Sequence, residues 1–352
     1  MVGDLDLGAL AAETKALLRR RGVPDARALL RLALARGPGG LSLRETAAWA
    51  HVAGVAELTD ASLNDRLHNS CNFLAAVASA MLKGKVPGAD FRWPGRVLRI
   101  SDGSCVSRPG SKGTDWRVHA VYDLGAAGFS HFDLTDAHGA EALNRGAAIA
   151  GEIRLADRNY STAKGFRRFV ASAGEVASAD YIVRLRWSSL RLSTAEHEKF
   201  DLAAHMLGMA ADKPGDDINV LIQGAGEPMR ARLVILRKPE QAARAERQRL
   251  HQMASKKGRR LDSRSLLAAE FVVLATSLPA QVFPAGEILA AYRLRWQIEL
   301  AFKRLKSLLN LDRLPARTER SAKSWIWAHL ILAIAIDDHS QDFLEPSPCG
   351  AD

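Results

Sequence analysis

The sequence predicts an α/β protein with a mixed sheet, helices on both faces of that sheet, and a helical segment before it. The first observation is a change of hydrophobic period near residue 96. Before this point leucines recur at helical spacings, and after it apolar and polar residues alternate as in strands. The second observation is that three strand-like segments come first and then alternate with helix-like segments. That order produces a sheet with both antiparallel and parallel pairs.

Residues 1–88 are expected to form a helical domain. Ser42 and Glu45 form a capping-box pattern that opens a helix at 43–50, and Thr59 begins a second helix. Two short helices joined by a glycine-containing turn resemble a helix-turn-helix, the element that other proteins use to bind DNA. A helical hairpin that only packs against its neighbours is the alternative.

The first part of the core is placed at residues 89–186. Strands are expected at residues 96–102, 116–124, 129–135, 152–157 and 181–185. Helices are expected at residues 139–150 and 162–173. The resulting order, β-β-β-α-β-α-β, is that of a ribonuclease H-like core.

A basic, β-rich insertion is expected at residues 187–285. Its strand-like pieces and its charged helix are expected at residues 219–222, 231–236, 239–256 and 271–275. From Met229 to Arg264 there are 12 Lys or Arg against 3 Asp or Glu, nearly the whole net charge of +10. Such a run is often only a solvated helix. Its concentration in one segment favours a surface that contacts phosphates.

The second part of the core is placed at residues 286–338, with a helix at 287–309 and a tail at 339–352. The longest apolar stretch, Trp325–Ile336, contains His329 and is too short to span a bilayer, so no membrane association is expected. The three cysteines show no metal-binding spacing, and the N-terminus lacks the pattern of a signal peptide. These features favour a reduced, cytoplasmic setting; association with the nucleoid is implied only by the family resemblance described below.

Carboxylates at two strand ends are the candidate catalytic groups. Asp102 ends the first expected strand and Asp157 ends the fourth. If those strands are parallel neighbours, both carboxylates lie at one edge of the sheet. An Asp at a strand end is often only a turn residue, and Asp123, Asp133 and Asp136 are competing candidates.

A third carboxylate, Glu299, lies in the expected helix at 287–309. On one continuous helix, Tyr292, Arg295, Glu299 and Lys306 fall within about 60° of arc, with Lys303 beside them. Three converging carboxylates would bind two divalent cations, because hard oxygen ligands select Mg²⁺ or Mn²⁺. Two such ions stabilise both oxygens exchanged in phosphodiester displacement. A plain salt bridge from Glu299 to Lys303 is the alternative.

The spacing Tyr292-x2-Arg295-x3-Glu299-x6-Lys306 resembles the signature of bacterial cut-and-paste DDE transposases of insertion sequence family four. Ser-Asp-Gly-Ser at 101–104 and Ala-Asp-Arg-Asn-Tyr at 156–160 are similar to that family as well. The resemblance covers roughly residues 40–338 and implies a transposase.

The resemblance implies a metal site of Asp102, Asp157 and Glu299, holding two Mg²⁺ ions that Mn²⁺ could replace. It also implies DNA contacts from the basic and tyrosine side chains near that site: Tyr292, Arg295, Lys303, Lys306 and Arg158. In the family, the element end is nicked, a hairpin forms and is reopened, and the 3′-ends join target DNA. The expected partners are double-stranded DNA, as terminal inverted repeats and target, and a second copy in the DNA complex.

Two other functions remain open at this point. The first is a ribonuclease H-like nuclease that cuts DNA without joining it. The second is a non-enzymatic, domesticated DNA-binding protein, which three converging carboxylates disfavour because they would repel phosphate unless a metal neutralised them. A tryptophan holds a flipped base in some members of the family. Trp187 is the candidate for that role here, and core packing is its alternative.

Overall fold

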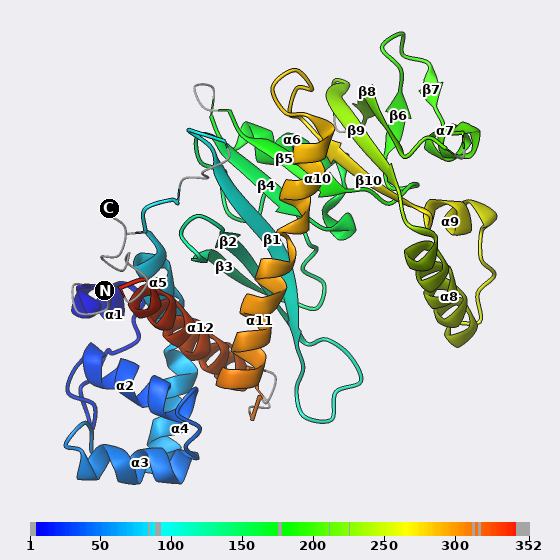
Figure 1. Ribbon diagram of the computed structural model, residues 1–352. Coiled ribbons are helices and arrows are strands. Elements are labelled where there is room, and N and C mark those ends of the chain that lie inside the picture. Colours follow the sequence, from blue (N-terminus) through cyan, green and yellow to red (C-terminus); the bar gives the residue numbers. More distant parts are fainter. Residues whose placement is uncertain are drawn as a thin grey trace, which may run out of the picture. The chain divides into compact units, whose positions relative to one another are not determined.

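The computed structural model describes residues 5–83, 85–88, 93–174, 178–210, 212–224, 226–311, 314–315 and 318–342. The chain forms two compact units. Unit 1 comprises residues 1–88, 103–139 and 297–352, and unit 2 comprises residues 89–102 and 140–296. Figure 1 labels the helices and strands of both.

Unit 1 is mainly helical. Its helices are α1 (Leu7–Glu13), α2 (Ala26–Arg36), α3 (Leu43–Val52), α4 (Asp60–Asn69), α5 (Cys71–Lys83), α11 (Trp296–Leu309, whose first residue belongs to unit 2) and α12 (Glu319–Asp342). The predicted capping box is present: the Ser42 hydroxyl accepts from the Glu45 amide at 3.2 Å, and the Glu45 carboxylate accepts from the Ser42 amide at 2.8 Å. The Thr59 hydroxyl caps α4 in the same way, at 3.3 Å.

The long apolar helix α12 packs along α5, α2 and α4, as Figure 1 shows for α5. Its Ser324 hydroxyl donates to the Leu67 carbonyl at 2.7 Å. Among the described residues no helix is both long and apolar enough to cross a membrane. The tail expected at 339–352 lies almost wholly outside the described residues, apart from the last turn of α12.

Unit 1 also holds the antiparallel pair β2 (Trp116–Asp123) and β3 (Gly128–Asp136), followed by the last residues of β1 (Val97–Val106). Phe129 on β3 packs against Phe302 of α11, with ring centroids 6.0 Å apart. The Phe129 amide also donates to the Asp337 carboxylate of α12 at 3.1 Å. The hairpin is therefore fixed to helices that come almost 200 residues later in the chain.

Unit 2 is built on a long sheet that begins with the first part of β1. The strands that follow β1 in the sheet are β4 (Glu152–Ala156), β5 (Asp180–Arg184), β10 (Phe271–Thr276), β9 (Met229–Arg237), β8 (Gly215–Gln223), β6 (Arg191–Ser193) and β7 (Lys199–Phe200). The pairs β1–β4 and β4–β5 are parallel, and the later pairs are antiparallel. Because β10 pairs with β5, the strands of the expected insertion extend the core sheet.

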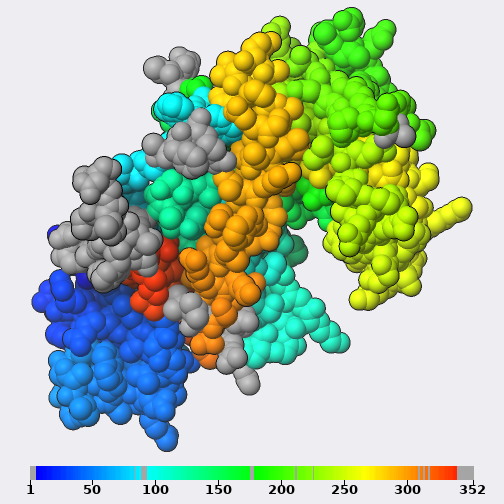
Figure 2. Space-filling model, viewed as in Figure 1, coloured from blue at the N-terminus to red at the C-terminus, as the bar shows by residue number. Residues whose placement is uncertain are grey.

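The helices of unit 2 are α6 (Ala163–Ala171), α7 (Leu202–Gly208), α8 (Glu240–Lys256), α9 (Ser263–Ala268) and α10 (Ala285–Arg293). One continuous core joins α6 to the strands from β4 to β6, from Phe166 and Phe169 through Tyr181 to Ile222 and Leu233. The charged helix α8 matches the expected one and lies on the surface of unit 2, in yellow-green in Figure 2.

The helix expected at 139–150 is wrong, because this segment forms irregular turns. Its carbonyls bond instead to a buried arginine. Arg154 on β4 donates to the carbonyl oxygens of Leu143 and Arg145, both at 3.2 Å. A tertiary donor thus replaces the helical hydrogen bonds on which the local pattern depended.

The single helix expected at 287–309 is also wrong. α10 ends at Arg293, Leu294 and Arg295 form a turn, and α11 begins at Trp296. The amides of Leu294 and Arg295 bond to carbonyls three residues back, at 3.0 and 3.1 Å, so the chain is wound more tightly there than in an α-helix. Tyr292, Arg295, Glu299 and Lys306, which were expected on one face of a single helix, are therefore divided between α10, the turn and α11.

Candidate active site

The two aspartates predicted as metal ligands follow the paired ends of neighbouring parallel strands. Ser101 of β1 is in register with Ala156 of β4, and Asp102 and Asp157 are the next residues on each chain. β1 continues to Val106, so Asp102 lies within a strand rather than at its end. The parallel pairing nevertheless stops one residue earlier, and both carboxylates fall at this edge.

A buried tyrosine lies beside the two aspartates. Tyr160 is 1% exposed, and burial raises the pKa of its phenol well above 10. The negative charges of Asp102, Glu141 and Asp157 raise this pKa further. Asp102 and Asp157 therefore act on the same phenol, together with a third acid that the sequence prediction missed. Glu141 gave no signal, because it lies in the segment that was expected to be a helix.

Asp157 also has an ordinary structural role. Its carboxylate accepts from the Asn159 amide at 2.8 Å and caps the short 3-10 turn Arg158–Tyr160. This bond holds the carboxylate at the end of β4 and leaves lone pairs for a further partner.

Tyr292, the penultimate residue of α10, lies near the same carboxylate and near Arg295 of the following turn. Burial raises the pKa of Tyr292 to about 12, while Arg295 and Arg184 oppose this shift and the charge of Asp157 adds to it. The phenol is therefore protonated at neutral pH and can donate a hydrogen bond. Within unit 2, the fold thus places Arg295, Arg184 and Asp157 near the Tyr292 phenol.

The remaining predicted residues lie on α11 in unit 1. Glu299 is in the first turn of this helix, and both Glu299 and Lys303 are exposed. Lys306 is half-buried in the last turn. The spacing of four residues places Glu299 and Lys303 on one face of α11.

Two of the acids considered as alternatives to Asp102 stabilise turns. Asp123 is 2% exposed and accepts from the Ala126 amide at 3.0 Å in the β2–β3 turn. Asp136 accepts from the amides of His138 and Gly139 at 2.9 and 3.1 Å. Asp133, within β3, is half-buried. Local turn geometry therefore accounts for Asp123 and Asp136.

A basic pocket of 270 Å³ opens next to Arg158 in unit 2. Its charged lining residues are Arg158, Arg184, Arg186, Lys238 and Glu246. Trp187 forms part of its wall; the indole N–H donates to the Ser265 hydroxyl at 3.2 Å, and Arg264 lies 4.7 Å from the ring centroid. The other side of this tryptophan packs against the core of unit 2.

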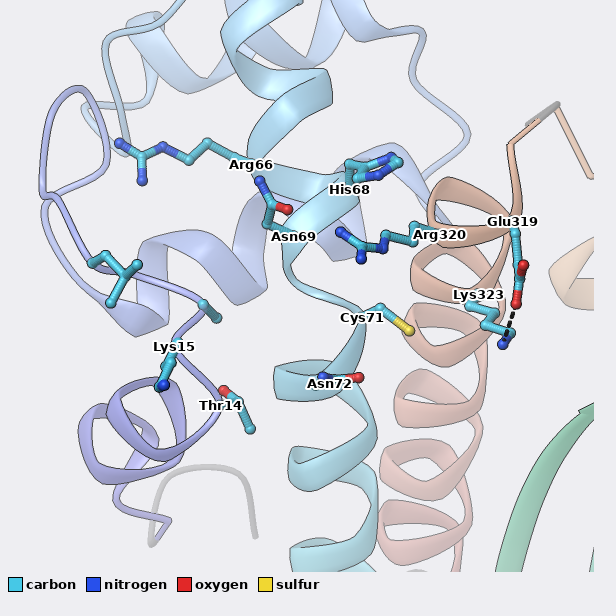
Figure 3. A pocket seen from close by; sticks show the side chains of 12 residues that line it. Thr14, Lys15, Arg66, His68, Asn69, Cys71, Asn72, Glu319, Arg320 and Lys323 are labelled. Carbon is cyan, nitrogen blue, oxygen red and sulfur yellow. Dashed lines mark ion pairs between the residues drawn. The ribbon is translucent and has the colours of Figure 1, made fainter.

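A larger cavity, of 730 Å³, lies in unit 1 where α4, α5 and the start of α12 meet the end of α1. Figure 3 shows its polar lining: Lys15, Arg66, His68, Asn69, Asn72 and Arg320 reach into it from these elements. Glu319 is paired with Lys323 at 2.6 Å. The cavity is therefore polar and mainly basic, which suits an anionic ligand.

A comparison with known protein families decides the identity of the chain. The family described as "Transposase DDE domain" matches residues 93–335, which include Asp102, Asp157 and Glu299. The chain belongs to the DDE transposase family. Membership implies an enzyme that uses divalent metal ions, and the carboxylates at the paired ends of β1 and β4 offer the hard oxygen donors that such ions prefer.

Curated relatives of this DDE transposase match almost its whole length. A putative transposase for insertion sequence element IS186A of Escherichia coli K12 is 42% identical over 98% of this chain and 93% of its own. The transposase for insertion sequence element IS421 of Escherichia coli has the same identity and coverage. A solved piggyBac transposase synaptic complex with hairpin DNA is 9% identical, with a TM-score of 0.48 over 95% of this chain and 71% of that one.

The described residues hold no group of three or more His, Cys, Asp or Glu side chains arranged for a metal ion. Within unit 2, the residues present provide part of a ligand set for a divalent metal ion. Asp102 and Asp157 supply two carboxylates directly after the last paired residues of β1 and β4, and the nearby Tyr160 phenol, whose pKa burial raises well above 10, is neutral. A cation there would reduce the repulsion between the acids that act on Tyr160.

Proposed function

We propose that the protein is the transposase of an insertion sequence, which binds the element ends, cleaves the DNA there and joins the freed 3′-ends to a target. The observation that carries this proposal is that Asp102 and Asp157 directly follow the last registered pair of two parallel strands, in a chain of the DDE transposase family. The names of its 42% identical relatives support the assignment to an insertion element.

The proposed catalytic set is Asp102, Asp157 and Glu299 in a ribonuclease H-like core. Glu299 is included in this set on the basis of the sequence, because it occupies the position of the acid in the motif that resembles the family-four signature. It lies in the first turn of α11. The three carboxylates would hold two Mg²⁺ ions, which stabilise charge on the attacking and leaving oxygens of the phosphodiester. By resemblance, the cleaved end passes through a hairpin before joining.

Side chains near Asp157 are proposed to position the DNA. Tyr292 can donate through its neutral phenol, and Arg295 and Arg158 can each bind a phosphate with two N–H groups. Lys303 and Lys306 of α11 are proposed to add point charges along the strand. None of these contacts would read sequence, because phosphates carry no base information.

The helices of residues 1–88 are proposed to add a second DNA contact. The mainly basic cavity shown in Figure 3 supports this, because Lys15 follows α1, Arg66 lies on α4 and Arg320 lies in the first turn of α12. Two element ends must be joined in one reaction, so the complex with DNA is proposed to contain two copies of the chain.

The decisive experiment measures Mg²⁺-dependent cleavage of DNA that carries the inverted repeats flanking the coding region. We expect Asp102→Asn, Asp157→Asn and Glu299→Gln each to reduce cleavage by at least about 10³-fold with DNA binding retained. Asp136→Asn is the matched control, because asparagine can still accept from the amides of His138 and Gly139. Full cleavage by the Glu299→Gln protein would refute the proposed site.

A strand-transfer assay with pre-cut ends separates the transposase from a nuclease. The proposed function requires covalent joining of the 3′-ends to a target plasmid. Cleavage without joining would instead support a nuclease, and neither activity with intact DNA binding would support a domesticated binding protein.

A further inference from the structure

One carboxylate sits among the cations of the pocket beside Arg158. Glu246 projects from the middle of α8, and its two oxygens accept from Arg249 at 2.9 and 2.7 Å. An Arg158 nitrogen lies 3.8 Å from the same carboxylate. The side chain of Glu246 is only 21% exposed. The anion that occupies the basic pocket is therefore a side chain of the protein itself.

The cations around Glu246 outnumber it. Arg184, Arg158 and Arg249 all act on Lys238, whose pKa is lowered first by burial and then by these like charges. Lys238 donates to the Ala269 carbonyl at 2.7 Å. Arg184 lines the same pocket, and its charge adds to the effect of burial in lowering the pKa of Arg158. Gathering four cations around one carboxylate is unfavourable by itself and leaves an excess of positive charge for a second anion.

The shape of the pocket limits which anion fits. Its 270 Å³ is smaller than the cavities that bury whole drug-sized molecules, and Leu250 and Phe271 form apolar parts of its wall. A phosphate on a longer strand would reach the guanidinium groups while the rest of the strand stayed outside. Arginine side chains bind phosphate with paired N–H groups in this manner.

We propose that this pocket is a phosphate-binding site for the DNA strand, and that Glu246 holds the place of that phosphate until DNA displaces it. The inference rests on the proposed function, because it takes DNA to be the ligand. Glu246 is a positioning residue: in free protein it keeps Arg158 and Arg249 assembled, and on binding it must leave or tolerate a second anion. Either course lowers the affinity for DNA.

The test removes the negative charge of the Glu246 side chain while keeping its size and shape. Glu246→Gln should bind a short duplex roughly 3- to 10-fold more tightly than the parent, because an internal competitor is removed. Glu240→Gln is the matched control: it removes the same charge from the same helix, but Glu240 pairs with Arg244 and Arg247, which do not line the pocket. Binding is measured by fluorescence anisotropy with chelator present.

A second variant distinguishes competition from general electrostatics. Arg184→Gln should weaken binding in the parent and remove the gain in the Glu246→Gln background, whereas Arg244→Gln should leave the gain intact. An equal gain from Glu240→Gln, or weaker binding by Glu246→Gln with an unchanged melting temperature, would overturn the proposal.

Because no metal is present in this assay, its outcome is separate from that of the cleavage experiment. Retained catalysis in Glu299→Gln would refute the catalytic site and leave the pocket untouched. An unaltered affinity in Glu246→Gln would refute the pocket and leave the proposed catalytic site standing.

Discussion

Arg154→Met should strongly destabilise unit 2, because this arginine holds together three segments beneath the candidate site. Its side chain and that of Glu152 are both fully buried and ion-paired. The guanidinium also donates to the Ser101 hydroxyl at 3.1 Å and to the carbonyls of Leu143 and Arg145. Ser101 precedes Asp102, so the network directly supports the strand that carries this proposed metal ligand.

The size of the stability loss in the Arg154→Met protein follows from the polar groups that the substitution leaves without a partner. Removing one member of a buried ion pair costs about 3–5 kcal/mol. Glu152 keeps the Ile149 amide at 3.0 Å and Arg99 at 3.7 Å, so we take the lower end for the carboxylate, about 3 kcal/mol. The orphaned carbonyls add about 1 kcal/mol. At 2–4 °C per kcal/mol for a unit of this size, the melting temperature should fall by roughly 8–16 °C.

Differential scanning calorimetry measures this shift, because it resolves the transitions of separate units. The control is the double variant Glu152→Met with Arg154→Met, in which no charge remains unpaired. It should recover a large part of the loss. A fall of less than about 2 °C in the single variant would refute the reasoning, since the buried carboxylate would then have found another partner.

Two further predictions concern unit 1. Ser42→Ala removes one bond of the capping box and should lower the stability of unit 1 by about 1 kcal/mol, measured by urea unfolding; no change would mean that α3 begins without its cap. Burial raises the pKa of Asp337 above its usual 3.8, so the folded state holds a proton that the unfolded state releases, and stability should fall as the pH rises from 3.8 through the raised pKa. Asp337→Asn, which keeps an acceptor for the Phe129 amide, should lack this fall. Parallel pH dependences of the two melting temperatures would contradict the assignment.

Strand positions could be predicted from short runs of strand-forming residues bounded by turn signals, even though β4 is buried at every position and therefore shows no alternation between two faces. The position of Asp102 beside Asp157 was anticipated as well, since two parallel strands of known order leave little choice of edge. The segment at 141–150 could not be predicted, because its hydrogen bonds go to Arg154, a residue that an isolated helix pattern does not contain. The break at Leu294–Arg295 gave no signal, since neither glycine nor proline marks it.

The sequence by itself determined the caps of α3 and α4 and the positions of most strands, and a resemblance in its motifs is the basis for proposing Glu299. These are local properties, set by residues within a few positions of one another. Only the tertiary structure decided that Tyr160 and Glu141 lie with Asp102 and Asp157, and that Glu246 fills a pocket formed by Arg158, Arg184 and Lys238. Such groupings bring together residues far apart in the chain, and their energies depend on burial and on charges that no local pattern records.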